Sequence, residues 1–214
     1  AAVGLGLFLH RASHSINRLV DRVLFRKHHR AEERLRRVTA ALPFASDERS
    51  IAEALVMEPV SNLALASAAL FYRTSTDAPL SRVLAHGWSE DHADSLDANG
   101  LLVRYLQAEH EPLRLDDPQF LPPGMPQGAA LPVLAIPIVN QHVLTALVLY
   151  GAHTNSTLPD PDEVELLHAL AKAAATSHQQ VRIATLARQN EAKQTRIIEL
   201  EASLRALGHE RLVG

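Results

Sequence analysis

The clearest hydrophobic pattern in the chain covers residues 131–175 and predicts a β-hairpin followed by a helix. Two apolar runs, 131–139 and 142–150, are separated by Asn140 and Gln141. Asn tolerates the left-handed backbone that a tight hairpin turn requires. Because both runs are apolar at consecutive positions, we expect a layered core in which the sheet is covered on both faces.

The segment after the hairpin carries the signals of a helix start. Asp160 can cap the helix, Pro161 suits its first position, and Glu163 completes a capping box. Apolar residues then recur at helical spacing, at Val164, Leu167, Ala171 and Ala174.

The upstream half of the chain predicts helices first and strands afterwards. A long helix over residues 13–42 carries an apolar stripe and ends at Pro43. A second helix starts at Ser46-Asp47 and runs to about Leu65, and we expect Pro59 to kink or split it. The remaining elements are strands at 66–73, 81–87 and 112–115, a helix at 95–108, and a Pro- and Gly-rich surface loop at 116–130.

The carboxy-terminal segment shows a heptad pattern. Its seam positions alternate spacings of four and three residues: Leu186, Asn190, Lys193, Ile197, Leu200, Leu204 and Leu207. Polar residues at Asn190 and Lys193 fit the seam of a dimer, where they fix the register, better than a stripe buried in one domain. The pattern favours a parallel dimeric coiled coil, with Leu19 and Val23 of the first helix as further interface residues. The alternative is one amphipathic helix that packs on its own domain.

Charge is distributed unevenly along the chain. Residues 1–37 hold nine Arg or Lys and three Asp or Glu, although the whole chain has a net charge of −3. The first nine residues are almost wholly apolar and the first Arg follows at position 11, an order typical of the cytoplasmic end of a membrane helix. We therefore expect a fragment cut within a membrane anchor, whose basic segment meets anionic headgroups rather than nucleic acid. The alternatives are a soluble protein with an apolar start and a signal-peptide remnant.

The composition and motifs of the chain argue against several kinds of functional site. The sequence has no cysteine, which excludes disulfides, thiolate metal sites, Cys nucleophiles and thioether-linked chromophores within it. His10 and His14 have a spacing that a metal could bridge, but no carboxylate lies near them, so we expect no metal. The sequence contains no Gly-rich phosphate loop, nucleophile elbow or HExxH motif, and we expect no enzymatic activity.

The order of these elements, together with several short motifs, resembles a GAF domain over about residues 34–182. The motifs are Ala68-Ala-Leu-Phe-Tyr-Arg73, Leu84-Ala-His-Gly87, Glu111-Pro-Leu-Arg-Leu-Asp-Asp117, Leu134-Ala-Ile-Pro-Ile138, Leu147-Val-Leu-Tyr-Gly151 and Asp160-Pro-Asp-Glu163. The resemblance implies an α+β fold: a GAF-like antiparallel sheet with helices on one face and a small-molecule pocket beneath loops on the other. It also implies kinship with bacterial sensor proteins, although fold does not fix function.

Four residues are candidates for such a pocket: Tyr72, Trp88, Arg104 and His110. Core or lid packing is the alternative role for Tyr72 and Trp88, and Arg104 can equally be a surface charge. The absence of cysteine argues against a covalently bound bilin, and the Asn-Lys…Phe…Asp-Glu signature of nucleotide-binding GAF domains is not apparent. The cofactor therefore stays unknown.

The sequence as a whole predicts four segments. These are the end of a membrane helix (1–9), a basic juxtamembrane signalling helix (10–42), a GAF-like domain (43–182) and a coiled coil (183–214). The predicted function is the cytosolic sensory module of a membrane-anchored bacterial signalling protein, a homodimer that passes ligand binding or membrane-helix motion to an output domain or protein. The alternative is a ligand-free dimerisation spacer.

Overall fold

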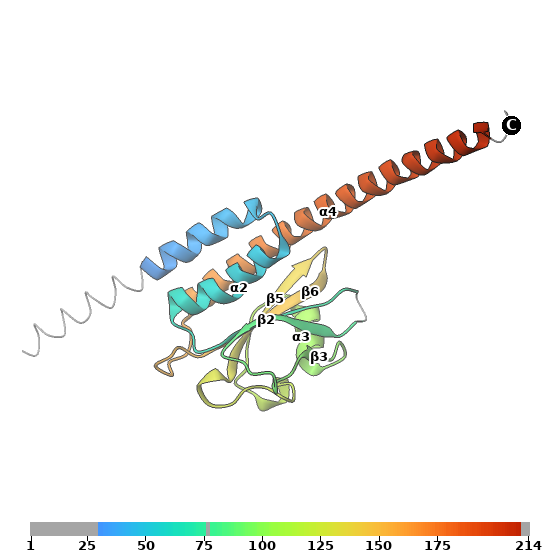
Figure 1. Cartoon of the computed structure of the whole chain (residues 1–214). Helices are drawn as coiled ribbons and strands as arrows, with labels where there is room; N and C mark the ends of the chain where they lie inside the picture. The colour runs from blue at the N-terminus through green and yellow to red at the C-terminus, as the bar shows by residue number, and fades with distance from the viewer. Residues whose placement is uncertain (1–29, 76–77, 211–214) are drawn as a thin grey trace, which may run out of the picture.

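The computed structural model describes residues 30–75 and 78–210 (Figure 1). Its centre is a six-stranded antiparallel sheet with strand order β3-β2-β1-β6-β5-β4. The strands are β1 (Ala68–Tyr72), β2 (Leu80–His86), β3 (Ser95–Leu96), β4 (Leu113–Arg114), β5 (Pro132–Asn140) and β6 (Val143–Gly151). The expected α+β fold with an antiparallel sheet is confirmed.

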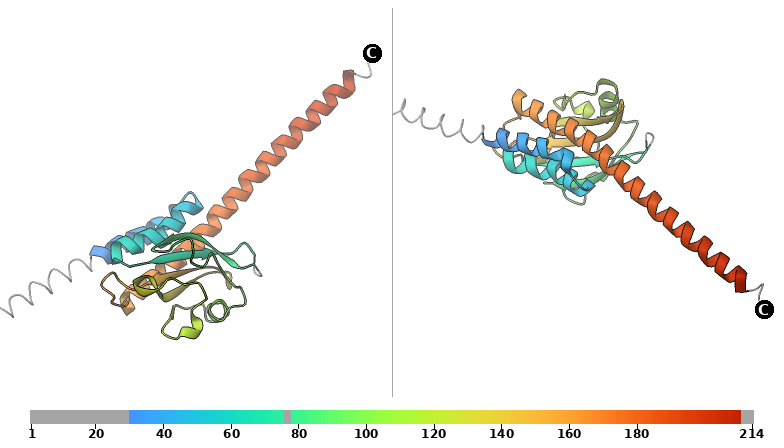
Figure 2. Two further views of the ribbon diagram at one scale, coloured as in Figure 1. Left: turned by 60° about the horizontal axis from the view of Figure 1, so that its bottom comes forward. Right: turned by 90° about the horizontal axis from the view of Figure 1, so that it is seen from above.

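Helices cover one face of this sheet, and loops with one short helix cover the other (Figure 1). A helix over residues 30–41, which we call the amino-terminal helix, is followed by the 3-10 turn η1 (Leu42–Phe44). The other helices are α2 (Glu48–Leu63), α3 (Leu101–Glu109) and α4 (Pro161–Glu210), with 3-10 turns η2 (Pro118–Phe120) and η3 (Gly128–Ala130). α4 continues far beyond the sheet (Figure 2).

Each face of the sheet has its own hydrophobic core, because side chains on a strand alternate between the two faces. In β1, Leu70 packs towards α2 and α4, whereas Phe71 packs towards α3 and the loops. The amino-terminal helix joins the helix-side core through Leu35, which is fully buried. Both cores are extensive, which fulfils the requirement that a sheet apolar on both faces be covered on both.

The predicted hairpin is present, but its turn lies one residue further along the chain. Asn140 still pairs with Val143, so the central turn residues are Gln141 and His142. Both have positive φ values, 48° and 64°, as a two-residue turn that matches the strand twist requires.

Pro59 does not split α2, one of the two outcomes that the sequence predicts for it. The helix runs without interruption from Glu48 to Leu63, and Pro59 is buried within it. A proline removes the N–H that would bond to the carbonyl four residues earlier, here that of Leu55. That carbonyl instead accepts a hydrogen bond from the hydroxyl of Tyr150 at 2.7 Å.

Other differences concern short elements. The predicted helix over 95–108 is a two-residue strand, β3, followed by a turn at 97–100 and then α3. The loop over 116–130 contains the turns η2 and η3, and its Phe120, Leu121 and Met125 pack against the core. α4 continues through Gly208, although glycine is the residue that most often ends a helix.

Predictions for residues 1–29 fall outside the described residues, including the membrane-helix end and the interface residues Leu19 and Val23. Across residues 30–75 and 78–210, no helix combines the length and the apolar character that a membrane span needs.

Candidate functional site

The space beneath the loops, where the resemblance places a ligand, is largely filled by side chains. Phe71 and Leu147 of the sheet pack there against Leu102 and Leu106 of α3, and all four are buried. Trp88 closes this core from the side, with its ring centroid 5.6 Å from that of Phe71 in an edge-on arrangement. This interior is therefore apolar core rather than an open pocket.

An open cleft of about 680 Å³ remains at the margin of this core, between the start of α3 and the loop that follows η2. Its polar lining comes from Ser95, Asp97, Asn99 and Gln119. Gly100 starts α3 without a side-chain cap, and residues 100–103 at this start line the cleft. Among the described residues, no Lys, Arg or His lines the cleft; Asp97 supplies a carboxylate, and Leu96, Leu101 and Phe120 supply apolar surface.

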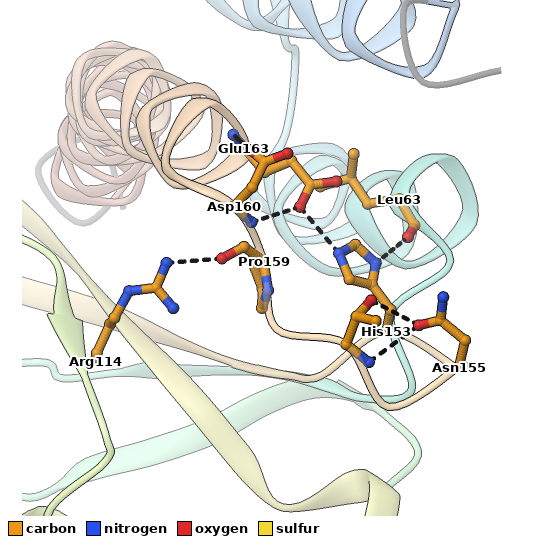
Figure 3. Close-up of polar contacts among 8 residues, drawn as sticks. Leu63, Arg114, His153, Asn155, Pro159, Asp160 and Glu163 are labelled. Carbon is orange, nitrogen blue, oxygen red and sulfur yellow. Dashed lines mark hydrogen bonds and ion pairs between the residues drawn. The ribbon is translucent and has the colours of Figure 1, made fainter. Parts of the chain in front are cut away.

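A second polar cluster fixes the start of α4 (Figure 3). The Asp160 side chain accepts the backbone N–H of Glu163, and the Glu163 side chain accepts that of Asp160, both at 2.9 Å. This reciprocal pair is the capping box that the sequence predicts.

Glu163 is 2% exposed, and it also lies 2.9 Å from Nε2 of His153. The other ring nitrogen of His153 is 2.7 Å from the carbonyl oxygen of Leu63, at the end of α2. The Leu63 carbonyl can only accept, so the ring nitrogen that faces it donates the hydrogen bond. His153 thereby ties the end of α2 to the start of α4.

Two further histidines, both on α4, lie close to carboxylates from other parts of the fold. His168 Nδ1 lies 3.6 Å from Glu111, and His178 Nε2 lies 3.4 Å from Glu48 of α2. Burial lowers the pKa of His168 from its ordinary value, with a smaller contribution in the same direction from Lys172. The roles of His153, His168 and His178 could not be predicted from the sequence, because none of their partners lies at a helical or strand spacing from them.

No protein-family model matches the sequence, and no curated protein matches it. Solved structures do resemble it. The GAF domain of a phosphoenolpyruvate-protein phosphotransferase from Coxiella burnetii superposes with a TM-score of 0.56 at 19% identity, over 74% of this chain and 98% of that chain. This chain has the GAF fold.

Two more GAF-like neighbours show how varied the hosts of the fold are. Free methionine-R-sulfoxide reductase from Neisseria meningitidis, in complex with its substrate, gives a TM-score of 0.58 at 12% identity, over 74% of this chain and 93% of that chain. Residues 122 to 287 of a methyl-accepting chemotaxis protein give a TM-score of 0.52 at 12% identity, over 69% of this chain and 98% of that chain. At these identities the likeness concerns the fold.

The structure does not bring the four predicted pocket residues into one place on the GAF sheet. Tyr72 lies on the helix-covered face, where its hydroxyl is 2.8 Å from Nδ1 of His178. Trp88 lies on the opposite face, under the Arg82 guanidinium, whose carbon is 5.7 Å from the ring centroid. Tyr72 and Trp88 therefore cannot contact one ligand across the sheet.

The other two pocket candidates belong to α3 of the GAF fold. Arg104 is exposed on its outer side. His110 ends the helix with a φ of 60°, and its ring lies 6.2 Å from that of His142 at the hairpin tip. Gln107 of α3 also contacts the hairpin: its side chain accepts a hydrogen bond from the backbone N–H of Leu144 and donates one to the carbonyl of His142, both at 2.9 Å. This end of α3 is thus fastened to the hairpin.

The predicted dimer residues on the carboxy-terminal helix lie on α4, which is one continuous helix through the heptad region. The side chains of Leu186, Asn190, Ile197, Leu200, Leu204 and Leu207 are outside the described part of the structure, and Lys193 is exposed. The interface itself remains a prediction. Among residues 30–75 and 78–210, no group of three or more His, Asp or Glu side chains could hold a metal ion.

Proposed function

We propose that this chain is a sensory or regulatory module of a signal-transduction protein, in which the GAF domain passes its state to an output through α4. One observation carries the proposal: α4 packs its first turns against the sheet and then continues as the same helix to Glu210 (Figure 2). Its 50 residues correspond to a rod of about 75 Å. A rotation or shift at the sheet would be conveyed along such a rod.

The anchoring of α4 supports this function. Three histidine–glutamate contacts hold its buried part, and the partners belong to the β6–α4 loop, the segment before β4, and α2. The helix is therefore sensitive to rearrangement in several parts of the domain. Similarity to a chemotaxis-protein segment agrees with a signalling role, and the proposal carries that role over to this chain.

The output helix would act in a homodimer, with the heptad seam as the contact between two copies. Sedimentation equilibrium of residues 1–214 and of Leu200→Asp tests this directly, because a carboxylate in an apolar seam opposes pairing. Glu201→Gln, one position outside the seam, is the matched control. We expect dimers for wild type and the control and monomers for Leu200→Asp; a wild-type monomer at the highest attainable concentration would refute the dimeric relay.

The basic amino-terminal segment would hold the module at the cytoplasmic face of a membrane. Co-sedimentation with vesicles tests this part. Binding to vesicles rich in anionic phosphatidylglycerol, lost in neutral phosphatidylcholine and in high salt, is the expected result. Equal binding to both vesicle types, or to neither, would contradict it.

A ligand-free spacer is the second candidate function. It is favoured by the packed interior beneath the loops, where Phe71, Trp88 and Leu106 occupy the position expected for a ligand. Native mass spectrometry of the gently purified chain separates the two. Extra mass of a small molecule supports the sensor, whereas a bare dimer that gains no mass from metabolite extracts supports the spacer.

A further inference from the structure

A small crevice lies on the other face of the sheet, between the sheet and the helices α2 and α4. Its volume is about 70 Å³. Most of its walls are apolar, and they come from six elements; representative residues are Ile51, Ala52, Leu70, Ile138, Ala146 and Ala174. At its rim lies Val83 of β2, a strand residue that is 58% exposed.

Three buried alanines account for the space. Ala52 on α2, Ala146 on β6 and Ala174 on α4 all line the crevice, and each presents only a methyl group there, beside larger core residues such as Leu70 and Ile138. A cavity of 150 Å³ lined by aliphatic side chains holds benzene. A space of half that volume has room for about three carbon atoms and a small head group.

The crevice has a polar end formed by three side chains that contact one another. The Tyr72 hydroxyl is 2.8 Å from Nδ1 of His178, and Nε2 of His178 is 3.4 Å from the Glu48 carboxylate. All three residues line the crevice. The Glu48 carboxylate accepts hydrogen bonds, while the tyrosine hydroxyl and the imidazole can both donate and accept.

We propose that this crevice binds a small aliphatic alcohol, with its hydrocarbon part between the alanines and its hydroxyl group at the Tyr72–His178–Glu48 end. The apolar walls require a hydrocarbon body, because an unpaired polar group there would lose its hydrogen bonds to water. A carboxylate head would meet the negative charge of Glu48. A hydroxyl group is neutral, and it can donate to the Glu48 carboxylate or to the oxygen of Tyr72 while the Tyr72–His178–Glu48 contacts persist.

The crevice lies against α4, so a bound alcohol could regulate the signal that this helix is proposed to carry; this regulatory role rests on the proposed function. Ala174 and His178 are one turn apart on α4, and Ile183 beyond them is 60% exposed as the helix leaves the domain. An occupant would therefore contact the output helix directly. Binding itself does not depend on dimer formation, so the two proposals can fail separately.

The test is a titration of the full chain with 1-propanol, followed by methyl resonances in ¹H–¹³C NMR spectra. We expect saturable shifts at Ala52, Ala146 and Ala174, with propionate producing none. Ala146→Val fills the crevice with two extra methyl groups and should abolish the shifts. Ala108→Val, on the exposed side of α3, adds the same groups elsewhere and should leave them unchanged.

Two further variants keep the result interpretable. Ala52→Val fills the crevice from the opposite wall if Ala146→Val does not fold. Tyr72→Phe removes one hydrogen-bonding group and should weaken propanol binding about five- to tenfold, while xenon, which has no head group, should bind equally to wild type and to this variant. Non-saturable shifts, shifts that persist in both filled variants, or tighter binding of propionate would each overturn the proposal.

Discussion

The hydroxyl of Tyr150 donates a hydrogen bond to the backbone carbonyl of Leu55, 2.7 Å away, in the core between the sheet and α2. That carbonyl lacks its helical donor because residue 59 is proline. Tyr150 is 1% exposed, and burial raises its pKa far above the ordinary value, so it remains a neutral donor. A strand side chain thus compensates for a helix-breaking residue in a neighbouring element.

Tyr150→Phe should therefore lower the free energy of unfolding by about 1–2 kcal/mol, since it leaves a buried carbonyl without a partner. In a Pro59→Ala background the restored backbone N–H can bond to Leu55, and the same substitution should cost clearly less. Urea unfolding of the four proteins in this cycle measures the coupling. An equal cost of Tyr150→Phe in both backgrounds would show that the hydroxyl does not substitute for the missing N–H.

A second prediction concerns Gly151, the last residue of β6. A Cβ atom placed there would lie within van der Waals overlap of Ser67 Oγ, which itself donates to the carbonyl of Ala130 at 2.8 Å. Gly151→Ala should destabilise the protein by about 1–3 kcal/mol through overpacking.

Thermal unfolding of two further variants identifies the cause of the destabilisation by Gly151→Ala. Gly128 has a φ of +66°, and apart from its chain neighbours no residue comes within 4 Å of the position that a methyl group would take there, so Gly128→Ala reports backbone strain alone. Ser67→Ala removes the nearest clashing atom and should reduce the cost of Gly151→Ala. If Ser67→Ala leaves that cost unchanged, contact with the hydroxyl is not its origin.

Local sequence signals predict the parts of this fold that depend on neighbouring residues. The capping box of Asp160 and Glu163 is one example, because both partners lie within one helical turn. The predicted split at Pro59 is wrong, because the carbonyl that proline leaves without its helical donor is bonded by Tyr150, 91 positions along the chain. The two-residue strand β3 is defined by its pairing with β2, and Ser95 and Leu96 carry no local signal that predicts this pairing.

The candidate site is harder to predict for the same reason. Tyr72 and Trp88 are both aromatic and close in sequence, yet the alternation of strand side chains sends Tyr72 with Leu70 to the helix side. Trp88 follows the turn at Gly87, where φ is +73°, and lies with Phe71 on the loop side. Which face each residue occupies depends on what covers the sheet.

A third prediction tests how α4 is fastened at its start. Asp160→Ala removes one capping hydrogen bond and should cost about 1 kcal/mol. Glu163→Ala should cost more, about 2–3 kcal/mol, because it leaves both His153 Nε2 and the Asp160 N–H without their buried acceptor. Hydrogen exchange of the backbone amides in the first turns of α4 should accelerate in the same order. Glu165→Ala, on the same helix, is the control, and an equal effect there would argue against a specific anchor.

The last prediction concerns pH and His168, a buried residue of α4. Desolvation is the main cause that lowers its pKa from 6.5, and Lys172 on the same helix acts in the same direction, while Glu111 opposes them. The unfolded chain therefore binds a proton at His168 more readily than the folded protein does. On acidification through about pH 6.5 the unfolded state gains this proton first, so the folded state loses stability as the pH falls towards the lower folded pKa.

His168→Gln removes this contribution because glutamine does not titrate. Urea midpoints of wild type and variant, compared between about pH 7.5 and 5.5, should show a steeper loss of stability in wild type on acidification. The other histidines are common to both proteins, so their contributions cancel in the difference. Glu111→Gln withdraws the opposing carboxylate and should make the acid loss steeper still, since nothing then favours the imidazolium. A flatter profile for wild type than for His168→Gln would mean that the Glu111 contact outweighs burial at this site.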